Sequence, residues 1–362
     1  MQKPSPPNAH LKAIALISIL ISLPITPLFT ANADTPETFS IIWITDTQYL
    51  SETHPAYFSN LCQWIVENKN TYNIKMVIHT GDIVNDEGNR SQWLNANQSM
   101  GILLDSGIPY CWDAGNHDYN ATCWIGNQFI AFNPQIMQAK PYWVSDDFNG
   151  TSTAVRFDVS GWDFMVINVA FEANASVVAW ANNLLDANPQ SHVIVATHAY
   201  LNKDGTYDSW ASNFKSTVLD THANVFLTLS GHYHPAQGKW VREGGRDELF
   251  FNQQDAYNQA GAESARILTF DIAKGTVTVQ TYNLYLNQFM KDSDNNFTFN
   301  SSFENDATGN RVSPALGTAV VIGAVFVVVA SLIYAKERHR KSRSPKPKNG
   351  NCKISKINKH RM

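Results

Sequence analysis

The stretch Ile41-Ile42-Trp43-Ile44-Thr45-Asp46-Thr47-Gln48 passes from an apolar run directly into a polar fragment with a carboxylate and an amide. Short apolar runs of this kind are typical of strands buried on both faces of a sheet. In such sheets, ligands bind beyond the carboxyl ends of the strands. Four more fragments of this type follow along the chain, namely Gly81-Asp82, Gly115-Asn116-His117-Asp118, Thr197-His198 and Gly231-His232-Tyr233-His234.

Most of these fragments come just after an apolar run, as in Met76-Val77-Ile78, Val193-Ile194-Val195 and Val225-Phe226-Leu227. A single fragment would be weak support for a site, because His and Asp are also common as hydrogen-bonded loop residues at strand ends. Five fragments in one register are much stronger support. We therefore expect them to meet at one edge of a sheet, where they are candidates for a metal site.

Residues 1–33 have the layout of a secretory signal peptide. A polar start with two lysines precedes an apolar run from Ala13 to Leu28, and Ala31-Asn32-Ala33 then supplies a small-x-small cleavage signal. An uncleaved N-terminal anchor is the alternative. Pro24 and Pro27 favour the signal peptide, because proline destabilises a continuous helical span.

Residues 314–335 are apolar or small and carry no charge. With a rise of about 1.5 Å per residue, such a helix can cross a hydrocarbon core of about 30 Å. A buried core helix is the alternative, but residues 336–362 carry eleven Lys or Arg and one Glu. Because basic residues stay on the cytoplasmic side, we expect a single C-terminal transmembrane helix with a cytoplasmic tail. Residues 34–313 would then lie outside the cytoplasm.

The formal net charge of −4 conceals an uneven distribution of charge. Residues 34–313 carry 30 acidic and 14 basic side chains, which gives about −16, while the tail at 336–362 carries about +10. An acidic domain binds nucleic acid poorly, because contact with phosphates needs a basic patch. We therefore expect no nucleic-acid partner, and we expect the tail to serve membrane topology and attraction to anionic lipids.

Cysteine usage leaves one alternative open. Cys111 and Cys123 flank the Gly-Asn-His-Asp fragment, so they are candidates for a disulfide in an extracytoplasmic domain. Cys62 would then remain as a free thiol in the same domain, and Cys352 lies in the basic tail.

Strand-like and helix-like segments alternate between residues 34 and 285, which indicates an α/β domain. Residues 119–150 show no clear period and are expected to form an insertion or lid over the site, and the polar residues 286–313 a stalk. We expect helices at 56–68, 92–105, 177–185 and 210–219. We expect strands at 39–45, 74–79, 109–112, 155–158, 164–168, 192–196 and 225–229, and three closing antiparallel strands at 248–251, 267–272 and 277–282.

The five polar fragments resemble the sequence blocks of the calcineurin-like metallophosphoesterase superfamily. Those blocks are Asp-x-His, Gly-Asp, Gly-Asn-His-Asp/Glu, a lone His and Gly-His-x-His, and here they follow in the same order between Asp46 and His234. The resemblance covers residues 38–285. It implies a metallo-dependent phosphatase-like fold, a four-layer αββα sandwich of two sheets flanked by helices, with two metal ions at the edge that the sheets share.

Carried over residue by residue, the resemblance implies that Asp82 bridges the two ions with one oxygen to each. The other ligands it implies are Asp46, Gln48 and His234 for the first ion, and Asn116, His198 and His232 for the second. Mixed carboxylate, amide and imidazole ligands suit Mn, Fe or Zn better than calcium, which takes oxygen ligands. Two such ions about 3.5–4 Å apart activate a water molecule and clamp a phosphoryl oxygen for in-line attack.

Two further roles come from the resemblance. His117 is implied to stabilise the transition state or protonate the leaving oxygen without binding a metal, and Asp118 to orient His117 through a hydrogen bond. Gln48 departs from the commoner pattern, which has His at that position. Because a neutral amide oxygen binds metals more weakly than imidazole does, the first ion is expected to be held less tightly or to be a harder ion such as Mn.

The sequence thus predicts a membrane-anchored, extracytoplasmic phosphoesterase that hydrolyses a phosphomonoester or phosphodiester. The alternative from another class is a surface binding or structural domain that keeps the fold with an impaired site. Metal binding without hydrolysis of an aryl phosphate would distinguish that alternative from an enzyme. A nuclease is disfavoured by the acidic exterior domain.

Overall fold

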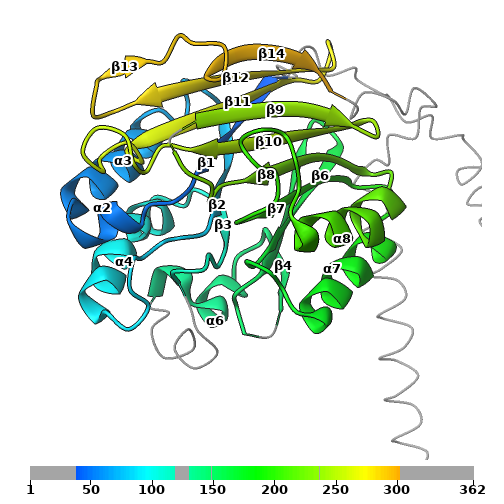
Figure 1. Ribbon diagram of the computed structural model, residues 1–362, viewed down its shortest axis with the longest axis horizontal. Coiled ribbons are helices and arrows are strands. Elements are labelled where there is room, and N and C mark those ends of the chain that lie inside the picture. Colours follow the sequence, from blue (N-terminus) through cyan, green and yellow to red (C-terminus); the bar gives the residue numbers. More distant parts are fainter. Residues whose placement is uncertain (1–37, 119–129, 148, 236, 302–362) are drawn as a thin grey trace, which may run out of the picture. The chain divides into compact units, whose positions relative to one another are not determined.

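The computed structural model describes residues 38–118, 130–147, 149–235 and 237–301, and within them two sheets lie face to face (Figure 1). The first sheet has the order β13-β12-β11-β1-β2-β3, with β14 paired to β12. Its strands are β1 (Thr38–Ile44), β2 (Ile74–Thr80), β3 (Tyr110–Asp113), β11 (Ser264–Asp271), β12 (Thr276–Asn283), β13 (Gln288–Phe289) and β14 (Asn296–Asn300).

The second sheet has the order β4-β5-β6-β7-β8-β10-β9. Its strands are β4 (Trp143–Asp146), β5 (Thr153–Val159), β6 (Trp162–Val169), β7 (His192–Thr197), β8 (Val225–Ser230), β9 (Gln237–Glu243) and β10 (Arg246–Asn252). The strands predicted at 155–158 and 164–168 form a hairpin, because β5 and β6 pair antiparallel and are joined by a turn at Ser160-Gly161.

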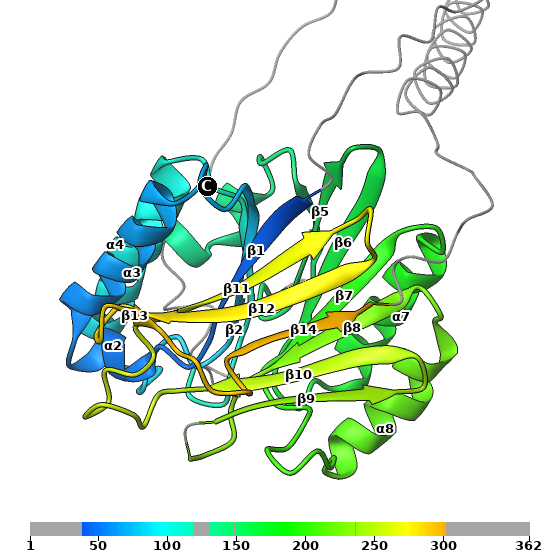
Figure 2. The ribbon, with the colours of Figure 1, turned by 90° about the horizontal axis from the view of Figure 1, so that it is seen from above.

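Helices cover the outer faces of both sheets. Seen from above, α3 (Pro55–Glu67) and α4 (Arg90–Asp105) lie on one side, and α7 (Ala175–Ala187) and α8 (Ser209–Thr217) on the other (Figure 2). The short elements are α2 (Gln48–Glu52), η1 (Ile130–Phe132), α6 (Pro134–Met137) and η2 (Leu219–Thr221). The predicted four-layer αββα sandwich is therefore confirmed.

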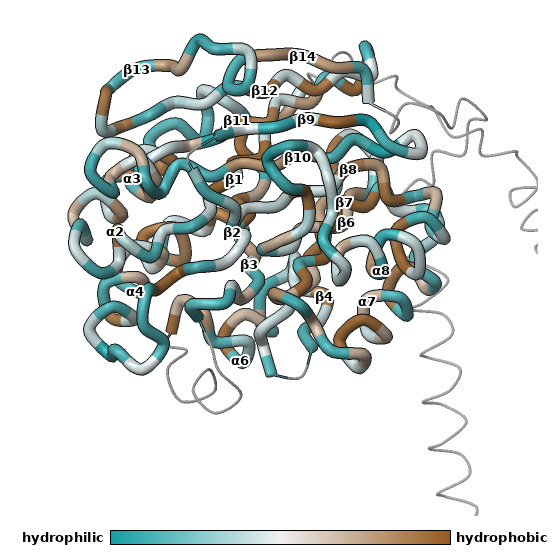
Figure 3. Tube along the Cα trace, in the orientation of Figure 1, coloured by the Kyte–Doolittle hydropathy of each residue, from teal (hydrophilic) through white to brown (hydrophobic). Residues whose placement is uncertain are grey.

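Strand β1 shows why the layers stack in this way. Ile42 and Ile44 belong to the apolar cluster under α3 and α4, whereas Ile41 and Trp43 belong to the cluster between the two sheets. All four side chains are fully buried, and burial of each contributes about 1.5–3 kcal/mol. In Figure 3, apolar residues follow the central strands while the connecting loops are mostly hydrophilic. A strand buried on both faces reads as a continuous apolar run, as the sequence indicates.

The direction of one predicted strand is wrong. Residues 248–251 were expected to belong to a closing antiparallel set, but β10 pairs in parallel with β8 and antiparallel with β9. Strand β9 is not apparent from the sequence, because it is an edge strand whose residues, Gln237–Glu243, are largely polar. As a consequence, the carboxyl end of β10 lies at the same edge of the sheet as the carboxyl end of β8.

The predicted polar stalk at 286–313 is also wrong in its described part. Residues 286–301 belong to the domain, because β13 and β14 both pair with β12. The stretch Asn296-Phe297-Thr298-Phe299-Asn300 alternates polar and apolar residues in the manner of a strand, and Phe299 is buried between the sheets. The many Asp and Asn residues of the preceding turn obscure this alternation in the sequence.

The insertion or lid predicted at 119–150 does not cover the site in its described part. Residues 130–146 form η1, α6 and the edge strand β4, and Ala131, Phe132 and Met137 are fully buried in the cluster under α4. This part of the segment packs into the body of the domain and is no lid. Residues 119–129, which include Cys123, lie outside the described residues, and Cys111 is a buried free thiol.

Within residues 38–301, apart from the stretches left undescribed, no helix is long and apolar enough to cross a membrane. The predicted signal peptide at 1–33, transmembrane helix at 314–335 and basic tail at 336–362 lie outside the described residues.

The pairing of β14 with β12 makes Phe299 part of the folded core. Phe299→Ala should lower the free energy of unfolding by about 3 kcal/mol, because it empties a buried position between the sheets. Phe299 also stacks on Trp240, with 5.4 Å between the ring centroids. Urea unfolding measures the effect, and the control is Thr298→Ala, an exposed change on the same strand that should cost no more than about 0.5 kcal/mol. Equal stability of the two variants would place β14 outside the folded domain.

Candidate metal centre

The predicted site residues lie where the two sheets meet. The backbone N–H of Asp46, after β1, donates to the carbonyl of Gly81 after β2, over 3.0 Å. The N–H of Gly231, after β8, donates to the carbonyl of His198 after β7, over 2.8 Å. The two sheets are joined because the backbone N–H of His232 lies 3.2 Å from each carboxylate oxygen of Asp46. The five polar fragments therefore form one cluster.

One half of this cluster centres on His198. Its Nε2 atom lies within hydrogen-bonding distance of three other predicted ligands, at 3.3 Å from Asp82 Oδ1, 3.1 Å from Asn116 Oδ1 and 3.1 Å from His232 Nδ1. A single imidazole nitrogen cannot donate to three neighbours at once. Ligand atoms of Asp82, His198 and His232 lie within 4.8 Å of one another. This half fits a divalent ion, because the ion would satisfy all of these lone pairs together.

The other half contains Asp46, Gln48 and His234, as the sequence predicts. Gln48 Nε2 donates to Asp82 Oδ2 over 3.1 Å, and the amide oxygen of Gln48 is buried without a hydrogen-bond partner. A buried amide oxygen that lacks a partner is costly unless it gains a ligand. This half therefore also fits a cation, although Gln254 stands among these three side chains.

Gln254 was not foreseen from the sequence. Its Nε2 atom lies 3.3 Å from Asp46 Oδ1 and 3.0 Å from His234 Nε2, and its Oε1 atom accepts a hydrogen bond from Gln48 Nε2. The signal was present, since Asn252-Gln253-Gln254-Asp255 follows the apolar run Leu249-Phe250-Phe251. The antiparallel strand that the sequence predicts at 248–251 would place this loop away from the site, whereas the parallel pairing of β10 with β8 brings the loop to the site.

Three of the predicted ligands have strained backbones. Asp46, Asp82 and His232 adopt positive φ angles of 51°, 51° and 75°, a region that residues other than glycine rarely occupy. Each such residue costs on the order of 1–3 kcal/mol, and strain of this kind gathers at functional sites. Gly115 permits the Asp82 turn, because a Cβ atom on Gly115 would lie 2.2 Å from Asp82 Oδ1.

Two of the histidines are oriented by hydrogen bonds at Nδ1. The Nδ1 atom of His198 lies 2.8 Å from the carbonyl of Thr80, and that of His234 lies 2.5 Å from Asp255 Oδ2. An Nδ1–H held in this way leaves the Nε2 lone pair of each ring for a metal. Asp255 is thus a second residue of the site that the sequence did not predict, on the same loop as Gln254.

His117 and Asp118 differ from their predicted relationship. His117 Nδ1 lies 2.9 Å from the carbonyl of Asn85, and no hydrogen bond to Asp118 is seen. Asp118 instead accepts hydrogen bonds from the backbone N–H groups of Ile83, Val84 and Gly115, over 2.7, 3.0 and 2.8 Å. The predicted orienting role of Asp118 is therefore wrong. This carboxylate ties the Asp82 loop to the Gly115 loop because backbone donors, rather than the imidazole, face it.

The protonation of the cluster is set by burial and by its neighbours. Burial raises the pKa of Asp46 to about 7, and the nearby Asp82 adds to this effect. Burial alone would lower the pKa of His198, but the carboxylates of Asp82 and Asp46 raise it to about 10. Burial and the positive charge of His198 lower the pKa of His232 to about 4. At neutral pH and without metal, the cluster therefore holds at least one proton where ligands are needed.

We predict that metal binding releases these protons. Loading the metal-free protein at pH 7 should release at least one proton per chain from His198, because a ligand nitrogen must be unprotonated. The release should fall as the pH rises from 6 to 8, since Asp46 loses its own proton through that range. Calorimetric titration in buffers of different protonation enthalpy measures the number released. Metal binding without proton release would show that His198 is not a ligand.

Comparison with known proteins identifies the family. A profile of the calcineurin-like phosphoesterase family matches residues 39–236. The chain is 31% identical over 282 residues to the uncharacterized protein YvnB of Bacillus subtilis (strain 168), an alignment that covers 75% of this chain and 21% of YvnB. This chain therefore spans about a fifth of the length of that relative.

Among solved structures, a dimetal phosphatase from Danio rerio is 14% identical with a TM-score of 0.49, and the alignment covers 72% of this chain and 98% of that one. The purple acid phosphatase PPD1 from yellow lupin (Lupinus luteus) is 13% identical with a TM-score of 0.48, over 72% of this chain and 53% of that one. The family profile covers more than half of the chain. The chain therefore belongs to the calcineurin-like phosphoesterase family.

Proposed function

We propose that this protein is a membrane-anchored, extracytoplasmic phosphoesterase that hydrolyses a phosphomonoester or phosphodiester at a dinuclear metal site. The arrangement of the Asp82 carboxylate carries the proposal. Its Oδ1 atom faces His198 at 3.3 Å, and its Oδ2 atom accepts from Gln48 over 3.1 Å. One carboxylate thus presents an oxygen to each half of the site, as a ligand that bridges two ions does.

Different residues of the site have different roles in the proposed hydrolysis. Asp46, Gln48 and His234 would hold one ion, and Asn116, His198 and His232 the other, with Asp82 between them. When bound, such a pair supplies an activated nucleophile and a clamp for the phosphoryl oxygens. Asn116 and His234 are exposed, so a substrate can reach both halves from solvent.

In this proposal, His117 exchanges the proton of the leaving group. Its backbone N–H donates to Asp82 Oδ1 over 3.0 Å, which keeps the residue beside the bridging carboxylate. Because Nδ1 lies against the carbonyl of Asn85, exchange of a proton with the substrate falls to Nε2. A half-buried imidazole with one nitrogen held by a hydrogen bond can act as a general acid through the other nitrogen.

The direct test of this function is hydrolysis of aryl phosphate monoesters and diesters by the metal-loaded protein. Asp82→Asn should lose bound metal and nearly all turnover, because the bridge needs a charged carboxylate with two oxygens. His117→Ala should keep its metal while turnover falls by about 10²–10⁴-fold, the usual contribution of a positioned acid. Elemental analysis of both variants accompanies the assay.

Two outcomes would contradict parts of this account. Two metal ions per chain in Asp82→Asn would remove Asp82 from the bridge, and equal loss of metal and rate in His117→Ala would make His117 a ligand. Metal binding by the unchanged protein without hydrolysis of any aryl ester would favour the alternative, a binding domain with an impaired site.

The location rests on the pattern of charge and hydropathy along the chain. Residues 314–335 are uncharged and apolar, and the basic residues 336–362 follow them. Protease added to intact cells should therefore spare a tag placed after Met362 and cut a tag placed near Asp34. Digestion of the C-terminal tag in intact cells would reverse the proposed orientation.

A further inference from the structure

Gln254 occupies the centre of the first half of the metal centre. Its side-chain amide contacts three of the four side chains implied as ligands of the first ion, namely Asp46, Gln48 and His234. The residue is 1% exposed, so its amide cannot turn to solvent instead. The position of Gln254 is therefore part of the construction of the site.

The loop after β10 holds Gln254 firmly in this position. The backbone N–H of Gln254 donates to Asn252 Oδ1 over 2.8 Å, and Asn252 Nδ2 donates to the carbonyl of His232 over 3.1 Å. The next residue, Asp255, binds His234 Nδ1. The same loop therefore orients one ligand of the first ion, contacts the backbone of a ligand of the second, and holds the Gln254 amide against Asp46, Gln48 and His234.

The contacts of the two amides indicate that this half of the site is suited to a cation. Gln48 and Gln254 pair with each other and turn their Nε2 atoms toward Asp82 and Asp46, while Gln48 Oε1 stays buried without a partner. Rotating both amides by half a turn exchanges their nitrogen and oxygen atoms at little steric cost. The amide oxygens would then face the carboxylates. That arrangement is stable only with a cation between them, because oxygens in a buried site repel one another.

We propose that Gln254 is an additional ligand of the first metal ion, so that two amides stand where the commoner pattern has one imidazole. The inference rests on the dinuclear site proposed above. The first ion would be held by oxygens from Asp46, Asp82, Gln48 and Gln254, with His234 as the single nitrogen ligand. Such an oxygen-rich set favours a hard ion such as Mn²⁺ or Mg²⁺ over Zn²⁺.

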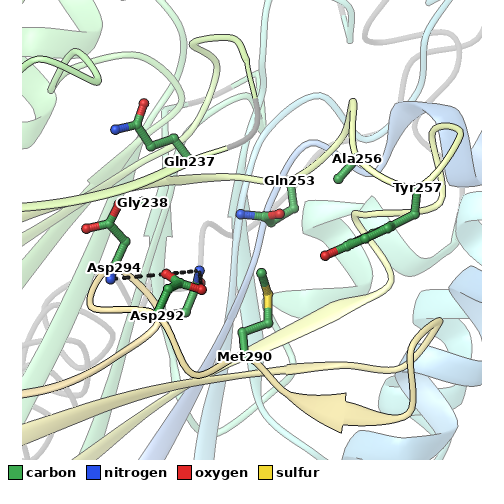
Figure 4. A pocket seen from close by; sticks show the side chains of 9 residues that line it. Gln237, Gly238, Gln253, Ala256, Tyr257, Met290, Asp292 and Asp294 are labelled. Atoms are coloured by element: carbon green, nitrogen blue, oxygen red, sulfur yellow. Dashed lines mark hydrogen bonds between the residues drawn. The ribbon is translucent and has the colours of Figure 1, made fainter.

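The neighbouring residue Gln253 provides a matched control. Its side chain lines a separate cavity of about 340 Å³, together with Tyr257, Met290 and Asp292 (Figure 4). Gln253 is nearly as buried as Gln254, at 5% exposure, and lies on the same loop. A substitution at Gln253 therefore reproduces any general disturbance of the loop without removing a side chain from the metal centre.

The experiment is titration of the metal-free full chain with Mn²⁺ alone, followed by competition with Zn²⁺. Gln254→Ala should weaken binding of the first ion by about 10–100-fold, which is the range for loss of a group that supports a metal site. The second ion should bind as before, which also shows that the variant is folded. Gln254→Glu supplies an anionic oxygen of the same shape, so it should tighten the first ion and strengthen the preference for Mn²⁺. Gln253→Ala should match the unchanged protein.

Equal binding of the first ion in Gln254→Ala would overturn the inference, and tighter binding would make Gln254 a side chain that competes with the metal. Weaker binding in Gln254→Glu, with the second ion still bound, would overturn it as well. Failure of the unchanged protein to bind two ions is a separate outcome, because it would contradict the dinuclear site itself.

Discussion

The two oxygens of the Asp82 carboxylate are the link on which the rest of the site depends. Asp82 follows β2 in the first sheet, whereas His198 and His232 follow β7 and β8 in the second. The carboxylate must therefore reach across the boundary between the sheets. It does so from a left-handed backbone conformation, with φ at 51°, beside a glycine whose missing Cβ leaves the necessary room. The backbone hydrogen bonds to Asp118 offset part of the strain, because they hold the loops on both sides of Asp82.

The architecture follows from the need to bring these loops together. Parallel strands place their carboxyl ends at one edge, and stacking two such sheets brings two sets of loops to a common edge. The outer helices bury the remaining apolar faces of the sheets. The apolar layers therefore provide most of the stability of the fold, and the edge of the sandwich can hold polar groups. Buried carboxylates and imidazoles at that edge cost free energy in the absence of a ligand. The pKa of Asp46 is raised to about 7 because the charged carboxylate is unfavourable in this buried position.

Much of the fold could be predicted from sequence because the central strands are continuous apolar runs and their polar ends share one register. The residues that were missed share a different property. Gln254 and Asp255 follow β10, whose direction depends on pairing with β8 and cannot be deduced from the composition of the strand. Strand β14 was hidden because its two phenylalanines lie in a stretch that is otherwise rich in Asn and Asp. Whether such a segment forms a strand, and in which direction, depends on the strands it pairs with in the folded protein. The local sequence pattern does not contain that information.

The role of Asp118 is a second example of a contact that cannot be predicted from the local sequence. Its place next to His117 suggests a hydrogen bond between the two, but successive residues in a tight turn point in different directions. The carboxylate faces backbone donors from two loops and acts on the shape of the site rather than on the imidazole. Family resemblance thus indicated which residues gather at the site, while the geometry showed what each of them contacts.

The claim that Asp82 joins two metal ions is tested most directly by anomalous diffraction from crystals of the protein grown with Mn²⁺. The account predicts two anomalous peaks about 3.5–4 Å apart, each within bonding distance of a different oxygen of Asp82. A single peak at this edge of the sandwich, or two peaks with no shared contact to Asp82, would contradict it.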